Sequence, residues 1–121
     1  KMLQTQGIDD YLIHGGNSSV LARGARMEAS GAGGSSATGW PVAMVHPMRP
    51  GKRLAEIRLD DRALATSGSG SQFFRHRGRR YGHVLDPRTG RPAEGVISAT
   101  VIAPTAAKAT FRSLFSTSRL T

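Results

Sequence analysis

Short β-prone runs separated by glycine and proline turns dominate the hydrophobic pattern of the chain. The run 10–14 stops at a Gly-Gly pair and resumes at 19–22, which predicts an antiparallel hairpin. A second hairpin is predicted from 72–77 and 79–85, which flank Gly78. Further strands are expected at 40–46, at 63–67, at 97–103 and, with only partial alternation, around Leu54, Ile57 and Leu59. The pattern is therefore typical of an antiparallel sheet.

Helical signals occur only near the two ends of the chain. Residues 1–7 are typical of a last helical turn closed by Gly7, a residue that favours the C-cap. Near the other end, Pro104 closes a strand, and Thr105 is a good N-cap for a helix that begins at about Ala106. Few helices beside many hairpins predict an α+β fold, an antiparallel sheet of hairpins with flanking helix remnants.

The segment 29–39 contains only Gly, Ser, Ala and Thr, and we expect it to be a flexible loop. Two interpretations of it remain open, an interdomain linker or a long hairpin loop within one sheet. The length of 121 residues corresponds to one domain or part of one, so we treat 1–121 as a single unit.

The strong positive charge of the chain is only a weak indication of its function. The net charge is +9, and three of the 17 basic residues are lysines, which leaves 14 arginines. Aromatic side chains among arginines can stack bases, but they also fit a hairpin with a charged outer face. We expect no nucleic acid as a partner on charge alone. The cluster in question consists of Phe73, Phe74, Arg75, Arg77, Arg79, Arg80 and Tyr81.

Other composition features exclude several classes of protein. The chain has no cysteine, so it can form neither a disulfide nor a thiolate metal site. No apolar run reaches the roughly 18 residues of a membrane span. The first residues also lack the pattern of a secretory signal peptide, but this by itself excludes no compartment.

A few small or polar residues at turns and strand ends are candidates for ligand contacts. Gly15 and Gly16 would let backbone N–H groups approach a phosphate, although the residues alone favour an ordinary hairpin turn. Thr66 and Ser67 could bond a ligand or cap a turn. A lone histidine such as His83 is more often structural than functional.

Three sequence blocks carry most of the small, polar and turn residues of the second half of the chain. They are Ala63-Leu64-Ala65-Thr66-Ser67-Gly68, the run from Tyr81-Gly82-His83-Val84-Leu85-Asp86 through Pro87-Arg88-Thr89-Gly90-Arg91-Pro92, and Ser98-Ala99-Thr100-Val101-Ile102-Ala103-Pro104-Thr105-Ala106. The segment 86–90 favours a structural Asx-type turn over a catalytic group.

In this order and at this spacing, the three blocks resemble the ApbE family of FAD:protein FMN transferases. Earlier in the chain, Gly15-Gly16-Asn17 matches a family Gly-Gly turn and Trp40-Pro41-Val42 matches its tryptophan strand. The resemblance spans 7 to about 107.

The resemblance implies the C-terminal part of an ApbE-type domain, truncated at both ends. Its activity would be the Mg-dependent transfer of FMN from FAD to a Thr or Ser of a target protein, with release of AMP. It implies FAD and that target protein as partners, and a bacterial cell envelope or periplasm as the compartment. It implies Leu85 as the best contact to FAD. The full set of expected cofactor contacts is Gly15, Gly16, Thr66, Ser67, His83 and Leu85.

The match fails after Lys108, so we describe 108–121 as a divergent tail. Thr110 stands where the family has a metal-binding Asp, and Leu114 stands where it has Thr. A leucine cannot bind a hard cation, which requires oxygen donors. We therefore expect FAD contacts without an intact magnesium site, and no transferase activity from this chain alone. The alternatives are a non-catalytic flavin- or nucleotide-binding module and, less favoured, a basic nucleic-acid-binding module.

Overall fold

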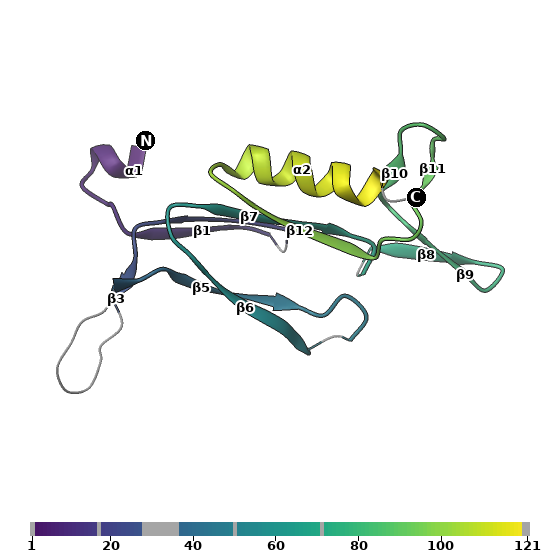
Figure 1. The fold of residues 1–121 in the computed structure, drawn as a ribbon, viewed down its shortest axis with the longest axis horizontal. Helices are drawn as coiled ribbons and strands as arrows, with labels where there is room; N and C mark the ends of the chain where they lie inside the picture. The colour runs from purple at the N-terminus through teal and green to yellow at the C-terminus, as the bar shows by residue number, and fades with distance from the viewer. Residues whose placement is uncertain (1, 17, 28–36, 50, 71, 120–121) are drawn as a thin grey trace.

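A four-stranded antiparallel sheet forms the centre of the computed structural model, which describes residues 2–16, 18–27, 37–49, 51–70 and 72–119. The strand order is β1-β2-β7-β12. Helix α2 lies on one face of this sheet, and the β5–β6 hairpin lies on the other (Figure 1). The elements of these three layers are β1 (Tyr11–Gly15), β2 (Ser19–Arg23), β5 (Trp40–Val45), β6 (Arg53–Leu59), β7 (Ala63–Gly68), β12 (Ser98–Ala103) and α2 (Ala106–Arg119).

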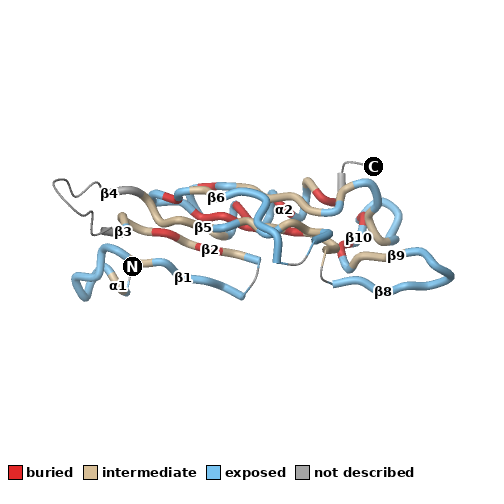
Figure 2. Tube along the Cα trace, turned by 90° about the horizontal axis from the view of Figure 1, so that it is seen from below, coloured by how far each residue is buried: buried red, intermediate tan, exposed pale blue. Residues whose placement is uncertain are grey.

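The alternation of side chains along β7 explains the two packed faces. Ala63 and Ala65 point toward α2 and form one buried cluster with Ala103 and Ala109. The side chain between them points the other way because successive residues of a strand alternate across the sheet. That residue, Leu64, belongs to a second cluster with Val20, Ala22 and Leu59, against which Trp40, Val42, Met44 and Ile57 pack. Buried residues line the centre of the molecule, and β1 is largely exposed (Figure 2).

The β5–β6 hairpin shares a core with the central sheet. The indole Nε1 of Trp40 donates a hydrogen bond of 2.9 Å to the carbonyl oxygen of Arg23. The short strands β3 (Arg26–Met27) and β4 (Ala37–Thr38) pair with each other and connect β2 to this hairpin. Most of the predicted flexible loop at 29–39 lies outside the described residues.

A separate hairpin, β8 (Phe73–His76) and β9 (Arg79–Gly82), extends beyond the end of the central sheet (Figure 1). The prediction of one continuous strand over 79–85 is wrong. The chain bends after Gly82 because Val84 turns inward, where it is 8% exposed and its carbonyl accepts the N–H of Ala93. Pairing then resumes as a new ribbon, β10 (Leu85–Asp86) with β11 (Arg91–Pro92).

The predicted helix boundaries are confirmed at both ends of the chain. Helix α1 (Met2–Thr5) ends in a Schellman motif, in which Ile8 N–H bonds Leu3 O at 3.1 Å and Gly7 N–H bonds Gln4 O at 3.1 Å. Gly7 has a φ of 74°, which glycine adopts without strain. At the start of α2, the Thr105 hydroxyl accepts the N–H of Lys108 at 3.3 Å, the geometry of an N-cap.

The predicted α+β class is therefore confirmed. The two strand pairs β1–β2 and β8–β9 are the hairpins that the Gly turns predicted. No helix within the described part of the chain is long and apolar enough to cross a membrane.

Candidate functional site

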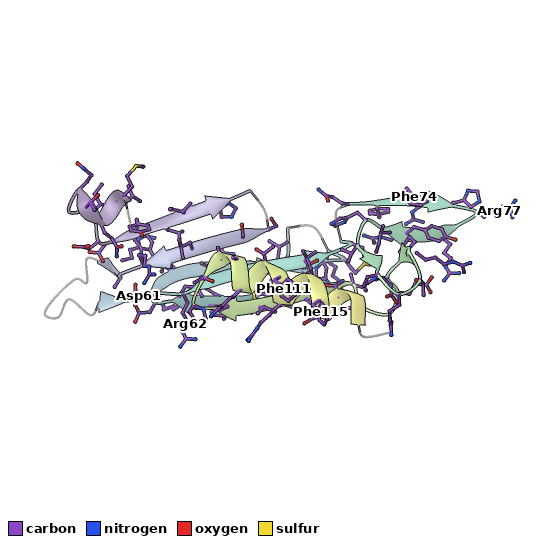
Figure 3. All side chains as sticks on the ribbon, turned by 90° about the horizontal axis from the view of Figure 1, so that it is seen from above. Asp61, Arg62, Phe74, Arg77, Phe111 and Phe115 are labelled. Atoms are coloured by element: carbon purple, nitrogen blue, oxygen red, sulfur yellow. The ribbon has the colours of Figure 1, made fainter. Side chains whose placement is uncertain are left out.

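An open groove of about 380 Å³ lies between the β10 ribbon and the second half of α2. His83 and Leu85 form one wall, and the Leu85 side chain is 55% exposed there. On the helix wall, Phe111 and Phe115 are one turn apart and stack with ring centroids 5.7 Å apart (Figure 3). The complete lining is His83, Val84, Leu85, Pro87, Phe111, Leu114 and Phe115. Six of these seven residues are apolar, so the groove favours a flat, apolar ligand group.

The bend after Gly82 aims His83 and Leu85 into the groove. His83 and Leu85 flank the buried Val84, so their side chains point away from the protein interior into which the Val84 side chain points. Nδ1 of His83 lies 3.3 Å from the carbonyl oxygen of Gln72. If Nδ1 carries the proton for this contact, Nε2 is a hydrogen-bond acceptor. The groove therefore has one polar nitrogen at its edge.

A tight turn after Leu85 holds this wall in place. One carboxylate oxygen of Asp86 accepts the backbone N–H of Arg88 at 2.9 Å, which is the Asx-type turn predicted for 86–90. The guanidinium of Arg88 also binds the same carboxylate through Nε and Nη2, the latter at 2.7 Å. Asp86 is 5% exposed, whereas the Arg88 side chain that covers it is 57% exposed, so the pair lies at the surface with its carboxylate turned inward. The side chain and backbone hydrogen bonds from Arg88 lower the pKa of Asp86 below its ordinary value.

This lowered pKa predicts a defined loss of stability in acid. The charged carboxylate stabilises the folded state above the ordinary Asp pKa of about 4, and this contribution disappears as the pH falls through the lower folded-state value. In the Asp86→Asn variant the amide oxygen can still accept the Arg88 N–H, but it cannot titrate. We therefore expect the urea midpoint of wild type to fall toward that of Asp86→Asn below about pH 4. Parallel midpoints for the two proteins from pH 6 to pH 3 would contradict this role.

The predicted Gly-Gly turn lies beside β7, at the end of the sheet where the groove lies. The N–H of Thr66 bonds the carbonyl oxygen of Ser18 at 2.8 Å, which places the turn against this strand. Gly16 has a φ of 63°, and a Cβ added there would meet no heavy atom within 4 Å. The turn therefore requires glycine for its backbone and leaves open space in front of it.

Thr66 and Ser67 point to opposite faces of the sheet. The Thr66 hydroxyl lies 2.9 Å from that of Thr100, on the face away from α2. Ser67 shares the α2 face with Ala65, and its hydroxyl is buried without a hydrogen-bond partner among the described residues. An unpaired buried hydroxyl costs roughly 1–3 kcal/mol, so Ser67 has an unused hydrogen-bonding group at this end of β7, beneath the residues that cover it.

Two of the six expected cofactor contacts, His83 and Leu85, thus share one groove, and the other four lie on β7 and the β1–β2 turn, outside its lining. Leu114 lines the groove, whereas Thr110 is exposed one turn earlier on α2. Phe111 and Phe115 are not among the predicted site residues, because they lie in the segment that departs from the family pattern. The spacing of these aromatic residues at i and i+4 on a capped helix was the signal that could have identified them.

The fold and groove define an α+β unit with a candidate ligand site at one end of its sheet. A sequence model of the ApbE family matches residues 1–115, and the chain belongs to the ApbE family. The match includes most of α2, beyond the point where the individual motif positions depart from the family.

Individual relatives give the same result. The FAD:protein FMN transferase of Salmonella typhimurium is 36% identical over 111 residues, which are 90% of this chain and 29% of that protein. The Rhodobacter capsulatus FAD:protein FMN transferase is 36% identical over 93 residues, 77% of this chain and 17% of that protein. The chain therefore spans less than a third of the length of these relatives.

Solved structures of family members have the same fold. The ApbE protein of Thermotoga maritima superposes with a TM-score of 0.75 at 32% identity, over 90% of this chain and 32% of that one. The flavin transferase ApbE of Vibrio cholerae gives a TM-score of 0.69 at 30% identity, over 93% and 33% of the two chains.

Proposed function

We propose that this unit binds FAD in the groove between β10 and α2, and that it serves a protein which transfers FMN from FAD to a Thr or Ser of a target protein. In that reaction the acceptor hydroxyl oxygen attacks the FMN phosphorus and AMP leaves. The observation that carries the proposal is the groove itself, which brings His83 and Leu85 against two stacked phenylalanines in a chain of the ApbE family.

The apolar part of the groove suits the flavin ring. A planar ring between Leu85 and the exposed faces of Phe111 and Phe115 would bury apolar surface on both sides. His83 would then offer a hydrogen bond at the edge of the ring. Gly15, Gly16, Thr66 and Ser67 are the proposed contacts for polar parts of FAD, because the open glycine turn and the unpaired Ser67 hydroxyl lie at the same end of the sheet.

A magnesium ion does not fit the residues of this groove. Leu114 supplies only carbon at the position where an oxygen donor is expected, and the lining is almost entirely apolar. Among the described residues, no group of three or more His, Cys, Asp or Glu side chains could hold a metal. Hard cations need several oxygen ligands. We therefore assign no step to a metal, and propose that these 121 residues bind FAD without catalysing transfer.

The same observation favours a second candidate, a flavin-binding module that has no transferase activity in any context. The two candidates differ in whether the rest of a longer protein supplies the missing oxygen ligands. Nucleic acid is not part of either proposal, and the partners proposed are FAD and, for the first candidate, the protein that carries the acceptor hydroxyl.

FAD binding is expected to be independent of magnesium in this chain, and dependent on it after two substitutions. We expect quenching of FAD fluorescence by wild type to be the same with Mg²⁺ and with EDTA. Thr110→Asp combined with Leu114→Thr supplies two oxygen ligands, and should bind FAD several-fold more tightly with Mg²⁺ than without it.

The matched control is Thr110→Asn with Leu114→Thr, which makes the same change in shape without the negative charge. It should show no response to Mg²⁺. No quenching by wild type at any FAD concentration would refute the flavin site, whereas quenching that requires Mg²⁺ in wild type would refute the assignment of a metal-free groove.

A further inference from the structure

The β8–β9 hairpin combines a dense positive charge with exposed aromatic rings, and the groove does not use it. Residues 72–83 contain four arginines and no acidic residue. At its tip Arg77 and Gly78 have φ values of 49° and 77°, as in a tight two-residue turn. Figure 3 shows Phe74 and Arg77 on an arm that extends away from α2. Phe74 is 59% exposed and Phe73 is 41% exposed.

Each aromatic ring of the hairpin has a stacking or cation–π partner within the hairpin. Tyr81 stacks on Phe74 with centroids 5.2 Å apart, and the Arg79 guanidinium lies 5.6 Å from the centroid of the Tyr81 ring. On the other side of the hairpin, Arg80 lies 3.7 Å from the centroid of the Phe73 ring. Stacking bases would compete with these internal partners for the ring faces, which makes single-stranded nucleic acid the less favoured partner.

Guanidinium groups held against aromatic rings still offer their N–H edges. Such groups are preorganised for two parallel hydrogen bonds to a carboxylate. Within the molecule, Nη2 of Arg79 makes a single hydrogen bond of this charge-assisted kind, to the Glu94 carboxylate at 2.5 Å. Arg80 is fixed differently, by hydrogen bonds to the carbonyl oxygens of Ser69 and Gly70. These bonds anchor the base of the hairpin.

Arg75 and Arg77 remain the exposed cations of the arm. Arg75 lies 6.0 Å from the centroid of the Phe73 ring, and no ion pair to either arginine is found within the described residues. The arm also leads directly to the groove, because β9 ends at Gly82 and the next residue, His83, lines the groove.

We propose that the β8–β9 hairpin is a docking arm for an acidic segment of a protein partner, with Arg75 and Arg77 as its main contacts. The identification of that partner as the acceptor of FMN rests on the proposed function. An extended acidic segment along the arm would place the residues that follow it at the groove. Charge complementarity and the Arg79–Glu94 pair select carboxylates as the chemistry that is recognised.

The test uses a fluorescein-labelled peptide of alternating Glu and Gly residues around a single Thr, and measures its anisotropy with this chain. We expect Arg75→Ala combined with Arg77→Ala to weaken peptide binding about tenfold, since two charge-assisted contacts are lost. The matched control is Arg49→Ala with Arg62→Ala, which removes the same charge from exposed positions outside the hairpin and should change the affinity less than about twofold.

Two further probes make the outcome decisive. A peptide with Gln in place of Glu should bind weakly to wild type, and an oligo-dT of equal charge should bind less tightly than the acidic peptide. Equal weakening by both arginine pairs, or tighter binding of oligo-dT, would overturn the docking arm. FAD quenching measured on the same samples separates the two proposals. The hairpin variants should still quench FAD fluorescence as wild type does. If wild type itself gave no quenching, the flavin site would be refuted and the peptide result would still stand.

Discussion

Replacing Leu59 with Ala should destabilise the protein more than any other single truncation in the hydrophobic core. Leu59 is 1% exposed at the end of β6 and is packed among Val20, Ala22 and Leu64. Removal of its isobutyl group leaves a cavity that the surrounding strands can only partly fill. Substitutions of this type cost about 2–5 kcal/mol. That is a large fraction of the roughly 5–15 kcal/mol that separates folded from unfolded domains.

Urea unfolding monitored by Trp40 fluorescence measures this effect, because Trp40 packs against the same cluster. The matched control is Leu54→Ala on the same strand, where the side chain is 57% exposed and should contribute less than about 0.5 kcal/mol. Similar urea midpoints for both variants would mean that the β5–β6 hairpin does not pack on the sheet in solution.

Local signals predicted those parts of the fold that depend on neighbouring residues. The Gly16 and Gly78 turns fixed two hairpins, and Gly7 and Thr105 fixed the helix boundaries, because each acts through hydrogen bonds or backbone angles within a few residues. The Asx-type turn at Asp86 was predictable for the same reason.

Features that depend on distant contacts were not predictable. Nothing near 79–85 indicates the bend before Leu85, which arises because Val84 is buried and bonded to Ala93 across the β10 ribbon. The β5–β6 hairpin has the strand pattern of a sheet member, yet it packs across the sheet face because Leu59 and Trp40 complete a cluster there.

The candidate site also combines residues that local sequence signals identified with residues that depend on distant contacts. Motif positions identified His83 and Leu85, which lie on one short segment. The opposite wall comes from α2, and Phe111 and Phe115 reach the groove only because the helix packs closely on β7 and β12. Four alanines in the layer between helix and sheet permit this close approach: Ala63, Ala65, Ala103 and Ala109.

The packing of this alanine layer affects both the stability of the fold and the shape of the groove, and Ala109→Leu tests both effects. Ala109 is 0% exposed, so a leucine there must push α2 away from the sheet at a cost of about 1–3 kcal/mol. The same displacement would move Phe111 and Phe115 away from Leu85 and open the groove. We therefore expect a lower urea midpoint together with FAD quenching weakened about tenfold under conditions where the variant is folded.

The control substitution is Ala107→Leu, which adds the same side chain at an exposed position of α2 and should leave both quantities nearly unchanged. A destabilised Ala109→Leu variant with wild-type FAD affinity would place the flavin elsewhere than between β10 and α2. A variant as stable as wild type would show that α2 does not rest on the alanine layer, and the helix could not then form a fixed wall of the groove. Because the expected result requires both changes to occur together, it ties the ligand site to the packing that positions it.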